Sequence, residues 1–274
     1  MRIRDILKEA IVKLKNSCPR PQFEAELLLA YFLKKERIYI HIFDNIEVKN
    51  HYEFFKLIER RANFEPLEYI IGEVSFYNIT LKIRKGVLIP RPETEILIDK
   101  VSEIIEKEDI ENIIEVGVGS GAISIVLARK FPNLKILATD ISDSAIELAK
   151  ENIKEFGLKE RVRVQKANII DNIDTSNIDL VVSNPPYIAN GFKLEPNVAN
   201  YEPKEALFGG ERGDELIKKI VLDIKRRGIK YLACEIGYDQ RESLEEFFKQ
   251  ERVEYYKFYK DLAGLDRGFI TRYF

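Results

Sequence analysis

The sequence predicts an α/β protein with a seven-stranded mixed sheet, preceded by a small N-terminal helical bundle. Three observations support this fold class. From residue 112 onward, short apolar runs alternate with helical stretches, which is typical of parallel strands joined by helices. The C-terminal segment holds two further strand-like runs with no helix between them, so the sheet should end antiparallel. Residues 1–70 repeat apolar side chains every three or four positions, as packed helices do.

The predicted N-terminal domain, residues 1–70, is built from helices. Helical periodicity is present in DILKEAIVKLKNS, PQFEAELLLAYFLKK and, less regularly, HYEFFKLIERRANF. Pro21 suits the first turn of the second helix, where a missing N–H has no consequence. We expect the basic clusters in ERRANF and in IKRRGIK to be solvated helix ends.

Residues 71–90 are predicted to form a β-hairpin that links two domains. The run VSFYNITLKIRKGVLIP has the β-branched and aromatic alternation of strands, with a turn expected at the Arg-Lys-Gly of residues 84–86. The third segment, residues 91–274, opens with a helix in RPETEILIDKVSEIIEK, where Pro92 and two early acidic residues suit a first turn.

The rest of the third segment supplies the sheet. Five strands are predicted at NIIEV, KILATD, RVRVQKA, IDLVVSN and IKYLACEIG. The helical stretches between them include GAISIVLARKF, SDSAIELAKENIKEFG and GDELIKKIVLDIKRRG. The two closing strands are VEYYKFYKD and GFITRYF. Parallel strands of this kind need helices on both faces of the sheet.

Composition limits the classes of function. The 274 residues include 44 basic and 46 acidic side chains, and the net charge of -2 argues against a protein that binds nucleic acid directly. No apolar window is long enough to span a membrane, and the first residues lack a secretory signal, so we expect a cytoplasmic protein. Cys18 and Cys234 lie far apart, without the spacing of a metal site or a disulfide scaffold. We expect both to be reduced and buried, and no metal to be bound.

A glycine-rich loop follows the first strand of the sheet. IIEVGVGSGAIS places Gly117, Gly119 and Gly121 between a strand and a helix, where a sharp turn and a close ligand both exclude a β-carbon. Asp140 ends the second strand, from where a carboxylate can accept both ribose hydroxyls of a nucleoside. An N-cap of the next helix is the other reading of Asp140. The loop and the acid together predict a nucleoside cofactor, either NAD or S-adenosylmethionine.

The end of the fourth strand distinguishes these cofactors. IDLVVSNPPYIA stops at Asn184, and the two prolines that follow have no N–H and force their predecessors into extended conformations. The side-chain oxygen of Asn184 and the carbonyl of Pro185 remain as two acceptors, which match the two hydrogens of a planar NH2 group. Tyr187 would lie flat against that group. Held in this way, a weakly nucleophilic amide or aromatic amine is aimed at an electrophile, and the sulfonium methyl of S-adenosylmethionine fits.

Several longer motifs resemble those of one family. They are IPRPETE, EVGVGSGAIS, ATD, VSNPPYI, YEPKEALFGG, EIGYDQ and DLAGLDRG, and they cover nearly the whole chain. The chain resembles the HemK-type glutamine methyltransferases, which modify class 1 peptide-chain release factors. The resemblance implies a Rossmann-like fold that uses S-adenosyl-L-methionine and releases S-adenosyl-L-homocysteine. It also implies that the helical domain docks the release factor body.

The resemblance assigns roles to individual residues. Asn184, Pro185 and Tyr187 would be catalytic, and Asn184, Pro185, Pro186 and Tyr187 would bind the glutamine of the substrate's Gly-Gly-Gln loop. The cofactor would contact residues of the glycine loop and of the strand ends: Gly117, Val118, Gly119, Ser120, Gly121, Asp140, Asn168, Ile169 and Asn184.

The sequence departs from the family pattern at two places. Asn168 and Ile169 stand where an acid and an aromatic residue usually flank adenine, so we expect weaker contacts there. GGERGDEL carries extra charge, and we expect residues 211–214 to be a solvated helix start. An adenine amino-methyltransferase for DNA or RNA is the alternative enzyme, and a non-catalytic adaptor is the alternative from another class. The expected assembly is a monomer.

Overall fold

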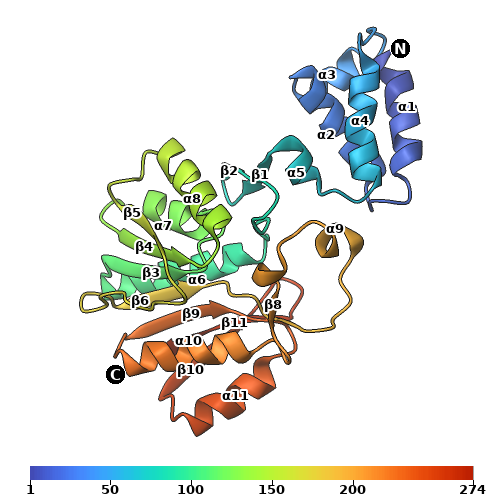
Figure 1. Ribbon diagram of the computed structural model, residues 1–274. Coiled ribbons are helices and arrows are strands. Elements are labelled where there is room, and N and C mark those ends of the chain that lie inside the picture. The colour runs from blue at the N-terminus through green and yellow to red at the C-terminus, as the bar shows by residue number, and fades with distance from the viewer. Residues whose placement is uncertain (274) are drawn as a thin grey trace. The chain divides into compact units, whose positions relative to one another are not determined.

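The computed structural model describes residues 1–273, which form two compact units. The first unit comprises Met1–Glu73 and Leu194–Tyr201, and the second comprises Val74–Lys193 and the residues from Glu202 onward. Figure 1 labels their elements along the chain. The segment Leu194–Tyr201 belongs to the first unit although it is distant in sequence, which periodicity alone did not predict.

The first unit is helical, as the periodicity predicted. Its helices are α1 (Ile3–Leu14), α2 (Pro21–Leu33), α3 (Arg37–Ile42), α4 (His51–Ala62), α5 (Leu67–Ile71) and the short α9 (Pro196–Ala199). Pro21 is the first residue of α2, where its missing N–H leaves no helical bond unmade. The core of the unit is formed by apolar residues from α1 to α5, among them Ile3, Ile6, Leu14, Leu28, Leu29, Phe54 and Ile58.

Two expectations from the sequence are wrong in part, although Arg60 is exposed as expected. Arg61, in the ERRANF cluster, is not solvated but only 6% exposed, and its guanidinium donates to the buried carboxylate of Glu24 on α2. The charge is held inside because it has an ionic partner there. Cys18 is only partly buried, whereas Cys234 is fully buried, and both thiols are free.

The hairpin begins at the last residue of the first N-terminal segment, Glu73, and continues into the second unit, but its turn is not where it was expected. The strands are β1 (Glu73–Phe76) and β2 (Ile79–Lys82), which pair in a two-stranded sheet. The turn is Tyr77-Asn78, with Tyr77 at φ +55°, and not residues 84–86. The burial pattern shows why. Every second residue is buried in each strand, but this alternation changes phase between Phe76 and Ile79, where the chain turns. The glycine at 86 instead turns the chain toward the cavity described below.

The predicted mixed sheet of seven strands is confirmed. The strand order is β10-β11-β9-β6-β3-β4-β5. Five strands are parallel, and β11 pairs antiparallel with both β9 and β10. The bounds are β3 (Asn112–Val116), β4 (Lys135–Asp140), β5 (Val162–Lys166), β6 (Leu180–Ser183), β9 (Tyr231–Glu235), β10 (Tyr255–Lys260) and β11 (Asp266–Arg272).

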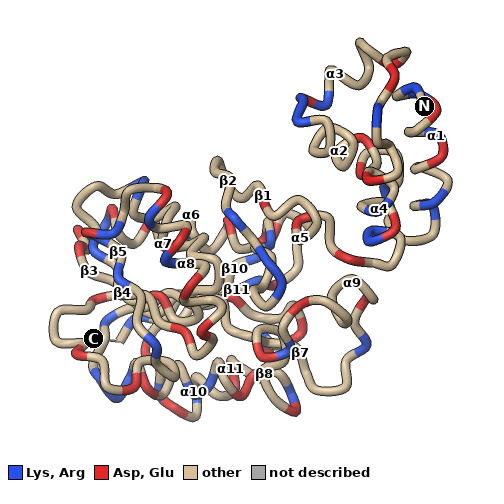
Figure 2. Tube along the Cα trace, turned by 45° about the horizontal axis from the view of Figure 1, so that its top comes forward, with Lys and Arg blue, Asp and Glu red and all other residues tan. Residues whose placement is uncertain are grey.

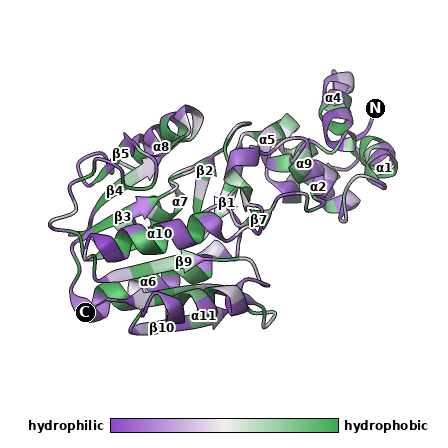
Figure 3. Cartoon of the chain, turned by 60° about the horizontal axis from the view of Figure 1, so that its bottom comes forward, coloured by the Kyte–Doolittle hydropathy of each residue, from purple (hydrophilic) through white to green (hydrophobic). Residues whose placement is uncertain are grey.

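Helices cover both faces of this sheet (Figure 1). One face packs against α10 (Glu215–Arg226) and α11 (Arg241–Gln250), in a core that contains the rings of Phe248 and Phe269. The other face packs against α6 (Thr94–Glu108), α7 (Ala122–Lys130) and α8 (Asp143–Glu155). In Figure 3 hydrophobic and hydrophilic bands alternate along α10, as the period of a half-buried helix requires.

Some elements differ from the sequence expectations. Helix α11 was not predicted, and α6 begins at Thr94, two residues beyond Pro92. A second two-stranded sheet joins β7 (Ile188–Ala189) to β8 (Phe208–Gly210), next to the single-turn helix η1 (Lys204–Ala206). Within residues 1–273, no helix has the length and apolar character needed to cross a membrane.

Candidate active site

A cavity opens at the carboxyl ends of β3, β4 and β6, inside the second unit. In an open α/β sheet this is the edge at which ligands bind. Of the residues singled out from the sequence, eight line the cavity: Gly117, Gly119, Asp140, Asn168, Ile169, Asn184, Pro185 and Pro186. Its apolar wall includes Ala145, Ala167, Leu216 and Ile220. Val118, Ser120, Gly121 and Tyr187 lie outside the lining.

The glycine loop needs glycine for backbone reasons. Gly117, Gly119 and Gly121 have φ values of +81°, +52° and +86°, which disfavour any residue with a β-carbon. A β-carbon on Gly119 would meet no atom within 4 Å, so this loop leaves open space on the cavity side. Gly117 N and Val118 N both donate to the carbonyl of Thr139, at 2.8 and 2.9 Å, which fixes the loop to the end of β4.

Asp140 holds the loop and does not cap the next helix. Its Oδ2 accepts from Gly119 N at 3.0 Å, and its Oδ1 accepts from Ser142 N at 2.9 Å. The N-cap of α8 is Ser142, whose side chain accepts from Ala145 N. Each carboxylate oxygen of Asp140 retains a second lone pair, and the residue lines the cavity. The carboxylate therefore remains able to accept hydrogen bonds from a ligand.

Asn168 and Ile169 follow β5 at the side of the cavity. Ile169 has φ +56°, a rare conformation for a β-branched residue, and the Thr139 hydroxyl donates to its carbonyl at 2.7 Å. Its side chain is 5% exposed and joins the apolar core. Asn168 is exposed, and its Nδ2 donates to Asp171 at 3.2 Å, so its Oδ1 stays available as an acceptor.

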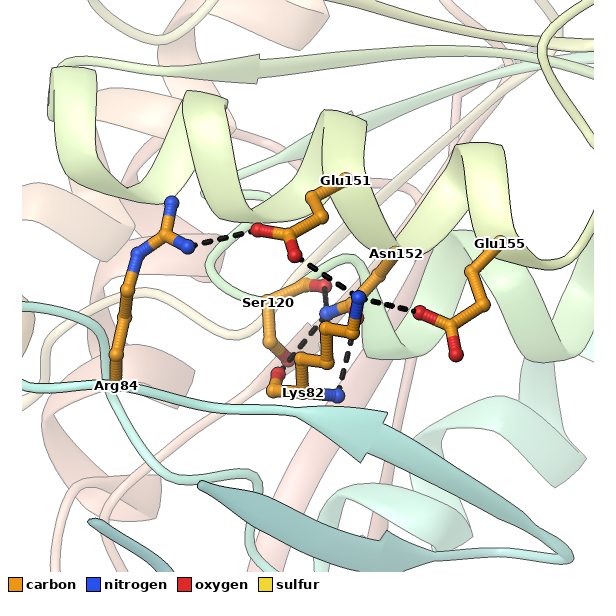
Figure 4. A network of polar contacts seen from close by, with 6 residues as sticks. All are labelled: Lys82, Arg84, Ser120, Glu151, Asn152 and Glu155. Carbon is orange, nitrogen blue, oxygen red and sulfur yellow. Dashed lines mark hydrogen bonds and ion pairs between the residues drawn. The ribbon is translucent and has the colours of Figure 1, made fainter.

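Asn152 of α8 joins the hairpin to the glycine loop (Figure 4). Its Oδ1 accepts from Lys82 N at 3.0 Å, and its Nδ2 donates to the carbonyls of Lys82 at 3.0 Å and Ser120 at 2.9 Å. The amide thus replaces a missing strand partner for Lys82 while it holds the loop. Around it, Lys82 and Arg84 pair with Glu151 at the surface.

Replacing Asn152 by Ala should destabilise the second unit by about 1–3 kcal/mol, because the backbone groups of Lys82 and the buried carbonyl of Ser120 lose their partner. Asn152 is 1% exposed, so water cannot substitute freely. Urea unfolding, read as the free energy of unfolding, measures the loss. Asn133→Ala, at an exposed position, is the control and should change stability by less than about 0.5 kcal/mol. Equal stabilities of the two variants would contradict the interpretation.

Two of the residues that line the cavity after the end of β6, Asn184 and Pro185, carry candidate acceptors. Asn184 Nδ2 donates to Thr94 Oγ1 at 2.9 Å, which leaves Asn184 Oδ1 on the other side of the amide. Within residues 1–273 no donor bonds Asn184 Oδ1 or the carbonyl of Pro185. A β-carbon built on Gly117 would lie 3.8 Å from the Asn184 carbonyl, an ordinary contact distance, so the glycine loop and this strand end are neighbours. The strand end therefore faces the glycine loop.

Tyr187 is placed differently from the other residues at this strand end. Its hydroxyl donates to Glu235 Oε1 at 3.1 Å, and its ring packs against the apolar core of the sheet. Burial, with Glu235 beside it, raises the pKa of the Tyr187 hydroxyl above its usual value. A stacking role for Tyr187 remains a prediction.

The chain beyond Tyr187 is held by the segment that contains β8. Ile188 N donates to the carbonyl of Leu207 at 2.9 Å, and Gln240 Nε2 donates to the Tyr187 carbonyl at 2.8 Å. A β-carbon on Gly213 would lie 2.3 Å from the same carbonyl, so only glycine fits there. The expectation of a solvated helix start at residues 211–214 is wrong for Asp214, which is 2% exposed and accepts from Ser243 and Lys218.

Sequence reasoning missed residues that form or brace the site. Residues 86–88 line the cavity on one side, and Pro203, Glu205 and Ala206 line it on another. These two segments are joined by Glu202, whose buried carboxylate accepts from Arg91 at 2.6 Å and from Ile89 N at 3.2 Å. Only the motifs IPRPETE and YEPKEAL could have indicated them, and neither shows which residues pair.

Comparison with family models identifies two matches. The model described as PrmC N-terminal domain matches residues 5–72, and the model described as Methyltransferase small domain matches residues 92–202. Among curated proteins, a release factor glutamine methyltransferase of Clostridium botulinum is 36% identical and covers 99% of both chains. One of Dictyoglomus turgidum is 39% identical over 84% of this chain and 83% of its own.

Solved structures with the same fold include two of human METTL16. Its catalytic domain in complex with an RNA hairpin superposes with a TM-score of 0.60 at 19% identity, over 71% of this chain and 75% of that one. Its N-terminal domain in complex with SAH gives a TM-score of 0.56 at 16% identity, over 89% and 94%. At this level of identity the likeness concerns the fold, which is that of a methyltransferase.

Proposed function

The chain belongs to the release factor glutamine methyltransferase family, and we propose that it methylates the side-chain amide nitrogen of the glutamine in the Gly-Gly-Gln motif of class 1 peptide-chain release factors. The methyl donor is S-adenosyl-L-methionine. One observation carries the proposal: Asn184 and Pro185 line the cavity, and among residues 1–273 no donor bonds Asn184 Oδ1 or the Pro185 carbonyl. Release factors act at ribosomes, so the enzyme would work in the cytoplasm.

The residues of the cavity fit this cofactor. The Asp140 carboxylate has lone pairs left for the two ribose hydroxyls, and the space beside Gly119 admits a ligand close to the backbone. Ala145, Ala167 and Ile169 supply an apolar wall for a flat base. When bound, S-adenosyl-L-methionine supplies an electrophilic methyl group on a positively charged sulfur.

The protein's contribution to the transfer is orientation. An amide nitrogen is a poor nucleophile because its lone pair is delocalised. Asn184 Oδ1 and the Pro185 carbonyl accept one hydrogen each, which fixes the position of the nitrogen and stabilises the positive charge that grows on it. The product amide regains neutrality by losing a proton after the methyl has arrived, so the chain needs no strong base.

Exposed side chains of the helical unit support a docking role. This unit carries apolar side chains that remain exposed on and after α3: Ile38 at 62%, Ile42 at 64%, Phe43 at 43% and Ile46 at 43%. Exposed apolar residues gathered in one segment mark interaction surfaces. We infer that this segment contacts the body of the release factor.

The charge distribution favours a protein substrate over nucleic acid. Figure 2 shows lysine and arginine interspersed with aspartate and glutamate along the trace. The net charge is -2, whereas binding to a phosphate backbone requires a basic surface. An adenine methyltransferase is therefore the weaker candidate.

A direct assay tests the proposed function. The protein is incubated with methyl-labelled cofactor and, in parallel, a release factor, the same factor with its Gly-Gly-Gln glutamine replaced by alanine, and a DNA duplex. Label should enter the first substrate alone. Label in the duplex, or in the glutamine-free factor, would refute the assignment.

The docking role is tested separately with Ile38→Ser combined with Ile42→Ser. The KM for the intact release factor should rise about 5-fold or more, because an exposed apolar contact is lost, while kcat at saturation is unchanged. Val12→Ser, which alters an apolar residue on α1 that is 73% exposed, is the control. An unchanged KM in the double variant would place docking elsewhere.

A further inference from the structure

A series of hydrogen-bonded side chains runs from the sheet to the amide of Asn184. Asn184 Nδ2 donates to Thr94 Oγ1 at 2.9 Å, and Thr94 Oγ1 donates to Glu235 Oε2 at 2.8 Å. The other oxygen of Glu235 accepts from the Tyr187 hydroxyl at 3.1 Å. Thr94 is 4% exposed and Glu235 is 0% exposed. Neither lines the cavity.

The direction of these bonds follows from what each group can donate. An ionised carboxylate has no hydrogen to give, so the hydroxyls of Thr94 and Tyr187 must both donate to Glu235. Since the one hydrogen of Thr94 is thereby used, its oxygen can only accept. The neighbour that it meets must then be the NH2 end of the Asn184 amide. The carbonyl end, Oδ1, is left for the cavity.

If the hydrogen bonds of this series ran in the opposite direction, the site would be disabled. If Glu235 carried a proton or were an amide, it could donate to Thr94, whose hydrogen would then be free to point at Asn184. The Asn184 amide would turn so that its oxygen accepted that hydrogen. Its NH2 end would face the cavity, where it would oppose the hydrogens of the substrate amide instead of accepting them.

We propose that Thr94 and Glu235 are positioning residues that select the amide orientation of Asn184, and that ionised Glu235 is the state that supports methyl transfer. The inference rests on the proposed function in one respect only, which is the identity of the substrate group that donates to Asn184. Neither residue touches the reacting atoms, because both act through Asn184.

The surroundings of Glu235 make this state sensitive to pH. Burial raises the pKa of Glu235 to about 7, against the opposing effects of the bonds from Thr94 and Tyr187 and of the Arg267 charge. Glu93 also raises it, and Cys234 and Tyr259 are the other titratable neighbours, each neutral near pH 7 because burial raises its pKa. The active orientation should therefore be lost as pH falls through about 7.

The orientation can be observed without any substrate. Side-chain amide NMR signals of Asn184, assigned by their loss in Asn184→Ala, are followed from about pH 6 to 8. They should shift in the wild type with a midpoint near 7 and stay constant in Glu235→Gln. Signals that do not move with pH in the wild type would overturn the inference, whether or not the variant folds.

Kinetics provide the second measurement. Thr94→Val should lower kcat about 3- to 10-fold with cofactor Kd unchanged, and Thr94→Ser should restore it, because only the hydroxyl matters. Ser102→Ala removes another buried hydroxyl of α6, bonded to the Ile98 carbonyl, and serves as the matched control. A Thr94→Val enzyme as fast as Ser102→Ala would refute positioning. If the wild type does not methylate release factors, the proposed function fails, and the NMR titration still decides this inference.

Discussion

Replacing Asn184 by Ala should lower kcat for release factor methylation by about 10²- to 10³-fold, which is the usual effect of removing one preorganised polar group from a transition state. The variant lacks Oδ1, so the substrate nitrogen keeps only the Pro185 carbonyl as acceptor. Cofactor affinity should change little, because the contacts offered by Asp140 and the glycine loop are intact. Single-turnover methylation and calorimetric cofactor binding measure the two quantities.

The control for this variant is Asn190→Ala. Asn190 is an exposed amide six positions further along, bonded to Glu211 at 3.2 Å and outside the cavity lining. Its loss should leave kcat within about twofold of the wild type. Turnover by Asn184→Ala at the rate of the control would mean that the strand end does not hold the substrate amide.

Asp140→Ala should weaken S-adenosyl-L-methionine binding by about 1–3 kcal/mol, or about 5- to 150-fold in Kd, which is the range for a lost charged hydrogen bond. Two causes act together. The ribose loses its acceptor, and Gly119 N and Ser142 N lose theirs, which loosens the loop that borders the cofactor. Calorimetric titration with the cofactor gives the Kd directly.

Asp143→Ala separates this effect from a general loss of negative charge. Asp143 lies three residues away, exposed, and pairs with Lys166 at 2.7 Å. The Kd of the Asp143→Ala variant for the cofactor should equal that of the wild type. If Asp140→Ala binds as tightly as Asp143→Ala, the ribose lies elsewhere.

The strands and helices around the cavity could be predicted because their signals are local. β3 and β4 coincide with the predicted apolar runs, and the glycine loop follows β3 as expected. The hairpin turn was misplaced because residues 84–86 do form a turn, closed by Val87 N donating to the Arg84 carbonyl at 3.2 Å, but this turn follows β2 and does not join the two strands. The turn that joins them, Tyr77-Asn78, is marked only by a change in the phase of the burial alternation.

The buried polar groups could not be predicted. Asp214 was expected at the surface because charges usually lie there, yet it is buried, and its Oδ2 is bonded by Ser243 of α11 and paired with Lys218 of α10, the helix that Asp214 caps. Thr94 and Glu235 meet although 141 positions separate them. Nothing in the local pattern of either residue indicates the other.

The sequence by itself determined the backbone chemistry of the site. Glycines that permit positive φ and prolines that lack an N–H carry their consequences wherever they occur, because those properties belong to the residue. Only the tertiary structure decided which end of the Asn184 amide faces the cavity. That choice depends on the hydrogen-bond partners behind it, and packing brings them there from distant parts of the chain.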